Sequence, residues 1–165
     1  MATTNPIRLV YSALWDILEA QTDFATAVPS GNRIKYTSTS IPPDAKDTLS
    51  TADYPEVRIL ARGLRAHHHR TSNSSSLEIL WEIQVSSGDR RFQTLFDVEW
   101  YVFQAMTDWQ AHVAAVAWNG HPLVNRCRTV EAQANLGDPR RDRGNLGWSS
   151  VWAGFTELWI TTADL

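Results

Sequence analysis

The sequence contains a single cysteine, Cys127, among its 165 residues. One cysteine cannot form a disulfide within the chain, so the core must hold the fold, and this scarcity fits a reducing compartment. A chain of this length is large enough to bury such a core without metal or disulfide support. We therefore expect one domain spanning residues 1–165.

Long hydrophobic runs are also missing. The longest apolar segment, Val113 to Trp118, is far shorter than the roughly 20 residues of a membrane-spanning helix. The chain does not open with the basic and then apolar segments of a secretion signal. We expect a soluble protein that is made in the cytoplasm and has no membrane partner. Without secretion, the glycosylation sequon Asn73-Ser74-Ser75 is interpreted as a chance match.

Motifs that carry catalysis are absent as well. The chain has no Gly-rich phosphate loop, no G-x-S-x-G segment, no C-x-x-C pair and no H-E-x-x-H helix. Cys127 could act as a nucleophile with His112 or His121 as its base, but a lone cysteine in a strand more often serves packing. We expect no enzyme, no catalytic residue and no cofactor.

Charge of one sign is not in large excess, since 15 Lys and Arg residues face 18 Asp and Glu residues. The net charge of −3 argues against a general nucleic-acid binder. What the chain does have is eight tryptophans. Trp is enriched where protein surfaces are buried against partners, and the same number fits a module that binds a carbohydrate or a peptide.

The clearest pattern lies in the middle of the chain. Apolar and polar residues alternate from Leu77 to Val85, which predicts a strand with its odd-numbered face in a core. From Phe92 to Val113 the apolar residues follow helical spacing instead. This spacing predicts a long amphipathic helix packed over the sheet, with a break near Thr107 as an alternative.

The flanking segments supply further elements. Asn5-Pro6 predicts the start of a helix, because Asn caps helices and Pro suits the first helical position. Short strands are predicted at Arg33–Thr37, Val57–Ala61 and Leu123–Gln133. Trp148 to Thr162 has apolar residues on both faces, so this strand is either central or covered by a second subunit. The order predicts an α+β fold: a mainly antiparallel sheet with two principal helices packed on it.

Polar segments connect these elements. Ser38–Ala52 is expected to be a surface loop, Gly63–Ser76 a long hairpin tip, and Ala134–Gly147 a polar connection. Within the tip, His67-His68-His69 could begin a zinc or nickel site, but no carboxylate or cysteine is close in sequence, so a solvated loop without metal is expected. Arginines of the tip could contact phosphates, or lie on an ordinary solvated face.

The order of elements resembles the tail terminator (tail-completion) proteins of long-tailed bacteriophages. The resemblance covers most of the chain. It rests on an opening helix, two strands, a helix and a terminal strand, which begin at Pro6-Ile7-Arg8-Leu9, Tyr54-Pro55-Glu56-Val57-Arg58-Ile59, Leu77, Gly88-Asp89 and Gly147-Trp148.

The resemblance implies a structural virion protein that forms a hexameric ring at the head-proximal end of the tail tube. Such a ring ends tube polymerisation and joins the tail to the head or neck. The implied partners are further copies of the chain, the major tail tube protein and the head–tail connector, while DNA passes through the lumen without sequence-specific binding. The implied location is the virion, with assembly in the host cytoplasm.

A ring needs two different complementary patches on each subunit. The candidates for these patches are the outer surfaces of the helices, with Trp15 and Trp109, and the terminal strand, with Trp148, Trp152 and Trp159. The loop that carries Arg140, Arg141 and Arg143 is expected to project toward the lumen or an axial partner. The alternative function is a monomeric, Trp-rich binding module for a carbohydrate or a peptide.

Overall fold

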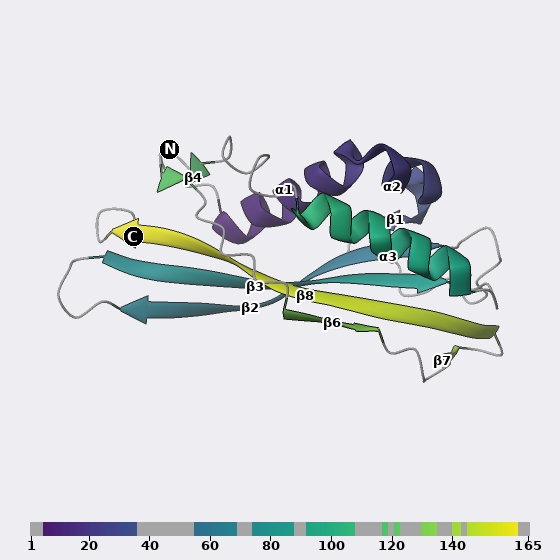
Figure 1. Ribbon diagram of the computed structural model, residues 1–165. Coiled ribbons are helices and arrows are strands. Elements are labelled where there is room, and N and C mark those ends of the chain that lie inside the picture. Colours follow the sequence, from purple (N-terminus) through teal and green to yellow (C-terminus); the bar gives the residue numbers. More distant parts are fainter. Residues whose placement is uncertain are drawn as a thin grey trace.

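The computed structural model describes residues 5–35, 55–68, 74–87, 92–107, 117–118, 121–122, 130–134, 140–142 and 145–161. Its main feature is a long twisted sheet with helices on one face (Figure 1). The helices are α1 (Pro6–Ala20), α2 (Thr22–Ala27) and α3 (Phe92–Thr107), and a short 3-10 turn follows at Ser30–Asn32. The fold is α+β, as the sequence predicts.

The main sheet has the strand order β1-β2-β3-β8-β6. Its members are β1 (Arg33–Ile34), β2 (Glu56–His68), β3 (Ser74–Ser87), β8 (Asn145–Thr161) and β6 (Val130–Ala134). Only the β1–β2 pair is parallel, and the other pairs are antiparallel. Strand β8 therefore lies between β3 and β6. Of the two alternatives for this strand, a central position in the sheet or a cover by a second subunit, the structure shows the central position.

Three further short strands complete the described part. Strand β7 (Arg140–Asp142) pairs with the beginning of β8, so the expected polar connection contains regular structure. Strands β4 (Ala117–Trp118) and β5 (His121–Pro122) pair with each other. The predicted Leu123–Gln133 strand is described only from Val130, and the Ser38–Ala52 loop lies outside the described residues.

The first two helices begin at side-chain caps. The Oδ1 atom of Asn5 accepts a hydrogen bond from the backbone N–H of Ile7 at 2.9 Å, and Pro6 occupies the first helical position, as predicted. Gln21 ends α1 and caps α2, because its Oε1 atom accepts from the backbone N–H of Phe24 at 2.7 Å. The helical segment is thus divided, and Phe24 at the start of the second helix is fully buried.

Arg33 fastens β1 to the helices. Its guanidinium donates to the backbone oxygens of Val28 at 2.9 Å and Ala25 at 2.8 Å, where α2 ends. It also lies 3.3 Å from a carboxylate oxygen of Glu19, which Lys35 approaches to 2.6 Å. Burial acts to raise the pKa of Glu19, but the hydrogen bonds and charges of Lys35 and Arg33 outweigh it and lower that pKa.

The core confirms the predicted face of β3. Its odd-numbered residues from Leu77 to Val85 are all buried. Among them, Trp81 donates from Nε1 to the Oγ1 atom of Thr156 at 3.2 Å. Its ring lies against Gly154, which is its partner in the register between β3 and β8. The absence of a side chain at Gly154 leaves the space that the indole fills.

The predicted hairpin tip at Gly63–Ser76 is wrong for most of its length. Pairing between β2 and β3 continues to His68 and Ser75, with a bulge at Arg62. Arg65 and His67 are exposed, and the backbone ladder forms between peptide groups whatever the polarity of the side chains. Helix α3 is described as far as Thr107, and the rest of the predicted helix, to Val113, lies outside the described residues.

Candidate functional site

Two of the tryptophans proposed for the interface are buried inside the subunit. Trp15 is 2% exposed and Trp152 is 7% exposed. The prediction that Trp15 lies on an outer surface is therefore wrong, because the buried stripe of α1 is wide enough to include it. Trp152 lies on the helix-covered face of β8, beside Ile83 of β3 in the register. Neither ring is available to a neighbouring subunit.

The other predicted interface residues lie beyond the described side chains. Trp109 is outside the described residues, and only the backbone is described at Trp148 and Trp159, both on β8. Their role at an interface stays a prediction.

The predicted arginine loop is partly a strand. Arg140 and Arg141 belong to β7, where they pair with Gly147 and Leu146 of β8, while Arg143 lies outside the described residues. Regular pairing here corrects the expectation of an irregular loop. Because β7 extends the antiparallel pairing of β8, these two arginines lie at one end of the sheet. Their orientation toward a lumen stays a prediction.

The structure instead exposes aromatic residues on α3. Phe96, Trp100 and Phe103 are 44%, 56% and 38% exposed. Their spacing of four and three residues places them on one face of the helix. The rings of Trp100 and Phe103 are stacked, with centroids 5.4 Å apart, and Phe103 continues to Trp152 at 6.0 Å. We call these three exposed residues the α3 patch.

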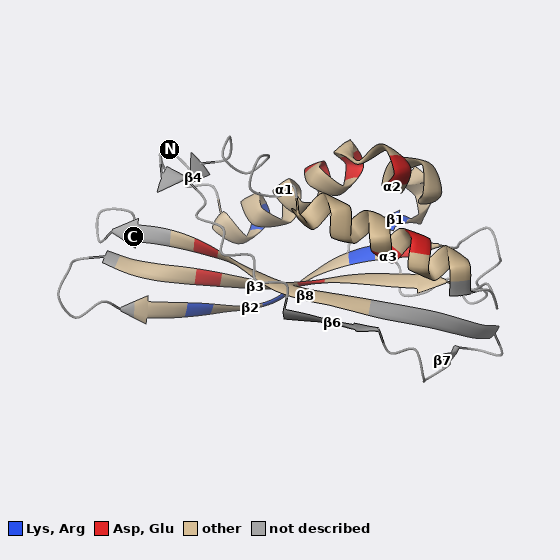
Figure 2. Ribbon diagram, viewed as in Figure 1, with Lys and Arg blue, Asp and Glu red and all other residues tan. Residues whose placement is uncertain are grey.

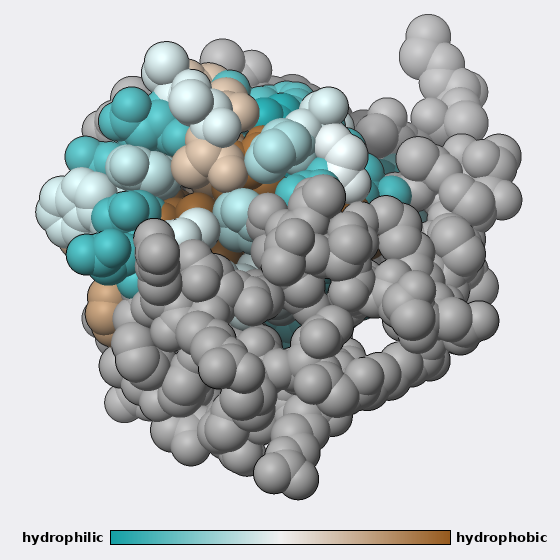
Figure 3. All heavy atoms as spheres, turned by 90° about the vertical axis from the view of Figure 1, so that its right-hand side faces the viewer, coloured by the Kyte–Doolittle hydropathy of each residue, from teal (hydrophilic) through white to brown (hydrophobic). Residues whose placement is uncertain are grey.

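The helical spacing of the apolar residues from Phe92 predicts that Phe96 and Phe103 pack over the sheet, yet both are exposed. The stripe that α3 buries consists of Leu95, Val98, Val102, Ala105 and Met106. The α3 patch is thus a second apolar stripe beside the first. Figure 3, which views the end of the molecule on the right of Figure 1, shows hydrophobic residues at the surface among hydrophilic ones. Of the two adjacent apolar stripes only the first is buried, and an exposed apolar stripe of this kind is a candidate interaction surface.

A second exposed segment lies on β2, at residues 61–67, and we call it the β2 arm. Every residue of the β2 arm is exposed, and Leu64 is 45% exposed. Strand β1 pairs with β2 only at Val57 and Arg58, so within the described chain the arm has a strand partner only on its β3 side. An exposed strand edge of this kind is a ready site for contact with another chain.

The β2 arm contains basic residues, which are blue on the ribbon in Figure 2. Arg62 pairs with Glu82 at 2.7 Å, and the Nε2 atom of His67 lies 3.3 Å from a carboxylate oxygen of Glu78. Arg65 is exposed between them. No local pattern predicts these two carboxylates beside the arm, because they belong to the next strand.

The histidine segment does not gather a metal site within the described residues. His67 has one carboxylate beside it, His68 is described by its backbone alone, and His69 lies outside the described residues. In the part of the chain that is described, no group of three His, Cys, Asp or Glu side chains could hold a metal ion. Cys127 and His112 are outside that part.

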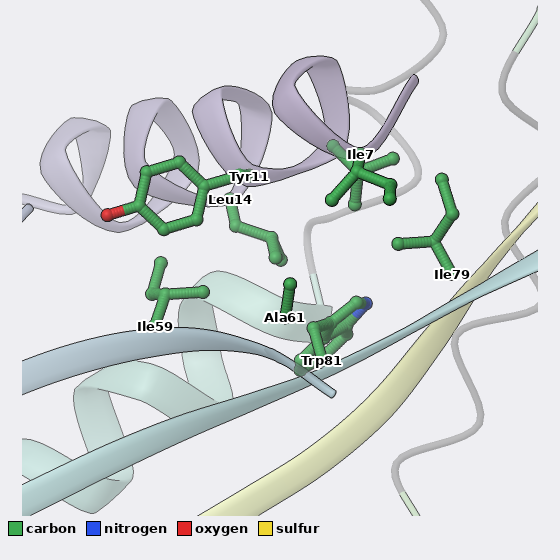
Figure 4. A pocket seen from close by; sticks show the side chains of 8 residues that line it. Ile7, Tyr11, Leu14, Ile59, Ala61, Ile79 and Trp81 are labelled. Carbon is green, nitrogen blue, oxygen red and sulfur yellow. The ribbon is translucent and has the colours of Figure 1, made fainter. Parts of the chain in front are cut away.

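A small apolar pocket lies between α1 and the sheet (Figure 4). Ile7 and Leu14 of α1 face Ile79 and Trp81 of β3 across it, and the Tyr11 hydroxyl points away from the other labelled side chains. Ile, Leu, Val and Ala dominate the lining, and no charged residue takes part. The pocket is a packing gap in the core and not a candidate active site. Among the described helices, none is long and apolar enough to cross a membrane.

The protein is thus of the α+β class, with a helix-covered sheet and two exposed surfaces, the α3 patch and the β2 arm. No protein-family profile and no curated protein matches the sequence. Among solved structures, the chain is similar to one from the virion of a native gene transfer agent particle, with a TM-score of 0.62. The match covers 92% of this chain and 95% of that chain at 16% sequence identity. At that identity the likeness shows a common fold.

Proposed function

We propose that this chain is a structural protein of a phage-like virion. The observation that carries the proposal is the fold likeness to a chain from the virion of a gene transfer agent, with a TM-score of 0.62. The likeness extends over 92% of one chain and 95% of the other, so the whole fold and not a single motif is shared. Fold alone does not define function, and the exposed surfaces supply the second argument.

Those surfaces suit a protein that works in an assembly. The α3 patch presents three large aromatic side chains to solvent, and Trp100 is 56% exposed. Clusters of exposed aromatic residues are typical of protein–protein contacts, where Trp contributes much of the binding energy. The β2 arm adds a second, different surface with an exposed strand edge.

More specifically, we propose that the protein is a tail terminator. Six copies form a ring on the head-proximal end of the tail tube, stop its polymerisation and join the tail to the head or neck. The element order that resembles tail terminators supports this assignment. The partners are then further copies of the chain, the tube protein and the connector, with DNA passing through the lumen. Assembly takes place in the host cytoplasm, and the protein remains in the virion.

In this proposal Trp109, Trp148 and Trp159 remain candidates for contacts between subunits or with the tube. Arg140, Arg141 and Arg143 remain candidates for the lumen or for an axial partner. Arginines there would contact DNA through its phosphates, which positions the duplex without reading its sequence.

The test is to remove the protein during tail assembly and to measure tail lengths by electron microscopy. Tails of uncontrolled length, or finished tails that do not join heads, are expected, and adding the purified protein should restore both. Imaging of the purified protein, alone and with tube protein, should show closed rings. A strict monomer that forms no ring with tube protein and leaves tail length unchanged would refute the proposal.

One observation favours the alternative of a carbohydrate- or peptide-binding module. Trp100 and Phe103 are stacked and exposed, with an interplanar angle of 20°, and such a flat aromatic platform can hold a sugar or a peptide side chain. This alternative predicts a monomer whose Trp fluorescence changes on binding a glycan or peptide. Mass measurement in solution separates it from the ring.

A further inference from the structure

The large hydrophobic residues that are exposed in the described chain fall into two patches. Phe96, Trp100 and Phe103 form the α3 patch, and Leu64 lies in the β2 arm. In Figure 1 the β2 arm reaches the left-hand end of the sheet, while α3 begins toward the right-hand end. A subunit with two different interaction surfaces at separate places, here the α3 patch and the β2 arm, is suited to contact copies of itself head to tail.

The charges of the two patches are opposite. Helix α3 contains Asp97 and Glu99 but no Lys or Arg, whereas the β2 arm contains Arg62 and Arg65 but no Asp or Glu. Figure 2 shows the same contrast, with red on α3 and blue on the arm of β2. Complementary charge of this kind sets the orientation of two partners and disfavours wrong pairings.

Charges close to the arm must be included in this comparison. Glu82 pairs with Arg62, and Glu78 lies 3.3 Å from His67 and opposite Arg65 in the register between β2 and β3. Arg65 is exposed, as is Asp97 on α3, and neither makes an ion pair within the described chain. Arg65 and Asp97 are therefore exposed charges that a contact between subunits can use.

A buried atom beside the α3 patch points the same way. One carboxylate oxygen of Glu99 is buried without a hydrogen-bond partner among the described groups. A buried carboxylate oxygen without a donor is costly, and a cation brought by a neighbour would reduce that cost. Leu64 and Arg65 point to opposite faces of β2, but both faces are exposed, so a partner that meets the strand edge can contact both.

We propose that the β2 arm of one subunit docks on the α3 patch of a second copy of this chain. Leu64 packs against Trp100 and Phe103, while Arg65 lies beside Asp97. The inference deepens the proposed function and rests on it, because it names the contact that joins neighbours in the ring. It also gives a partner to the parts of Trp100 and Phe103 that are exposed in the single subunit.

A charge exchange between molecules tests the pairing. Arg65→Glu brings two carboxylates together at the proposed contact, and Asp97→Arg brings two guanidinium groups together there, so each variant alone should associate at least about tenfold more weakly than wild type. When the two variants are mixed in equal amounts, every contact in an alternating ring again joins opposite charges. The mixture should therefore regain rings, measured by mass photometry and electron microscopy.

Matched controls separate this effect from misfolding and from net charge. Arg8→Glu and Asp16→Arg make the same charge changes at exposed positions of α1 and should leave association unchanged. Arg8→Glu, Asp16→Arg and Asp97→Arg should keep the wild-type melting midpoint when measured as monomers at low concentration. Arg65→Glu places a carboxylate opposite Glu78 in the register and should melt slightly lower, so association is compared at a temperature where every variant is folded. Trp100→Ala, which removes an exposed ring, should weaken association by about thirtyfold with folding intact.

Each outcome decides the inference. Loss of rings in both single variants and their return in the mixture supports it. Single variants that assemble like wild type overturn it, and so does a mixture that stays monomeric. Trp100→Ala rings that form normally but fail to bind tail tubes would assign the α3 patch to the tube protein and would also overturn it.

The inference and the proposed function can fail separately. If the exchange restores rings that neither cap tubes nor change tail length, the contact between copies stands and the terminator function falls. If wild-type protein limits tail length while Arg65→Glu and Asp97→Arg do so equally well, the terminator function stands and this contact falls. If wild-type rings form only on the tail tube, ring formation by the same variants and by their mixture is measured on tubes by electron microscopy.

Discussion

Replacing Gly154 by alanine should destabilise the protein strongly, although it adds only one methyl group. A Cβ atom at this position would lie 2.4 Å and 2.5 Å from two ring atoms of Trp81 and 3.0 Å from a third. Ordinary contacts between carbon atoms are about 3.5 to 4.0 Å, so the ring would have to move by more than about 1 Å. Trp81 is 3% exposed and surrounded by core residues, so the only space beside it is the small packing gap that it lines between α1 and the sheet, among the described residues.

The magnitude follows from three contributions. Overpacking a close-packed core costs about 1 to 3 kcal/mol. Moving the indole also lengthens the 3.2 Å hydrogen bond from Trp81 to Thr156, which is worth about 1 kcal/mol. Alanine is better than glycine within a strand by roughly 0.5 to 1 kcal/mol, which offsets part of the loss. We expect Gly154→Ala to lower the free energy of unfolding by about 2 to 3 kcal/mol.

Urea unfolding at a fixed protein concentration, followed by far-UV circular dichroism, measures this change. Trp81→Leu removes the ring atoms that the new methyl group would overlap, so a double-mutant cycle identifies the cause. With leucine at position 81, adding alanine at Gly154 should cost nothing or stabilise slightly, and the coupling energy should exceed about 1.5 kcal/mol. Additive costs, or a loss below about 0.5 kcal/mol for Gly154→Ala alone, would refute the reasoning.

Four further predictions concern the core, the helix–strand junction and the β2 arm. Trp81→Ala should lower the free energy of unfolding by about 3 to 5 kcal/mol in the same urea assay, and an unchanged midpoint would contradict the core placement. Arg33→Lys should lose about 1 to 2 kcal/mol, because lysine cannot donate in the fork that reaches two carbonyl oxygens and Glu19; a loss no larger than that of Lys35→Ala would argue against this role. The folded-state pKa of Glu19 is lowered from 4.5, so its contribution is present above pH 4.5 and is lost as the pH falls through the folded-state pKa; Glu19→Gln should flatten that part of a stability–pH curve. Replacing His67–His69 by alanine should leave folding and assembly unchanged with or without a chelator, whereas a chelator-sensitive ring would reveal a metal site.

Local signals predicted the parts of the fold that depend on neighbours in sequence. The cap at Asn5 involves a hydrogen bond only two residues away, and the alternation of β3 is complete within one strand. The wide apolar face of α3 was harder. Periodicity identified it as apolar but could not decide which of its two stripes faces the sheet, because β8 supplies part of the contact. The choice depends on packing between distant segments.

Other features had no signal in the sequence at all. Gly154 faces Trp81 only because β3 and β8 pair in one register. No residue pattern near either position predicts this pairing. The exposure of Trp100 and the burial of Trp15 likewise depend on which helix face the sheet covers. Counting tryptophans suggested a large interface, yet Trp15, Trp81 and Trp152 are all core residues. The candidate interface came from exposed area and charge in three dimensions.

The bulge at Arg62 has a consequence for shape. It inserts one residue into β2 between Ala61, opposite Trp81, and Gly63, opposite Leu80. A bulge increases the local twist and bends the strand that carries it. The direction of the β2 arm is therefore specified separately from the body of the sheet, at one position. If the arm joins neighbouring copies, deleting Arg62 would change the angle between subunits, and with it the number of copies that a closed ring can hold.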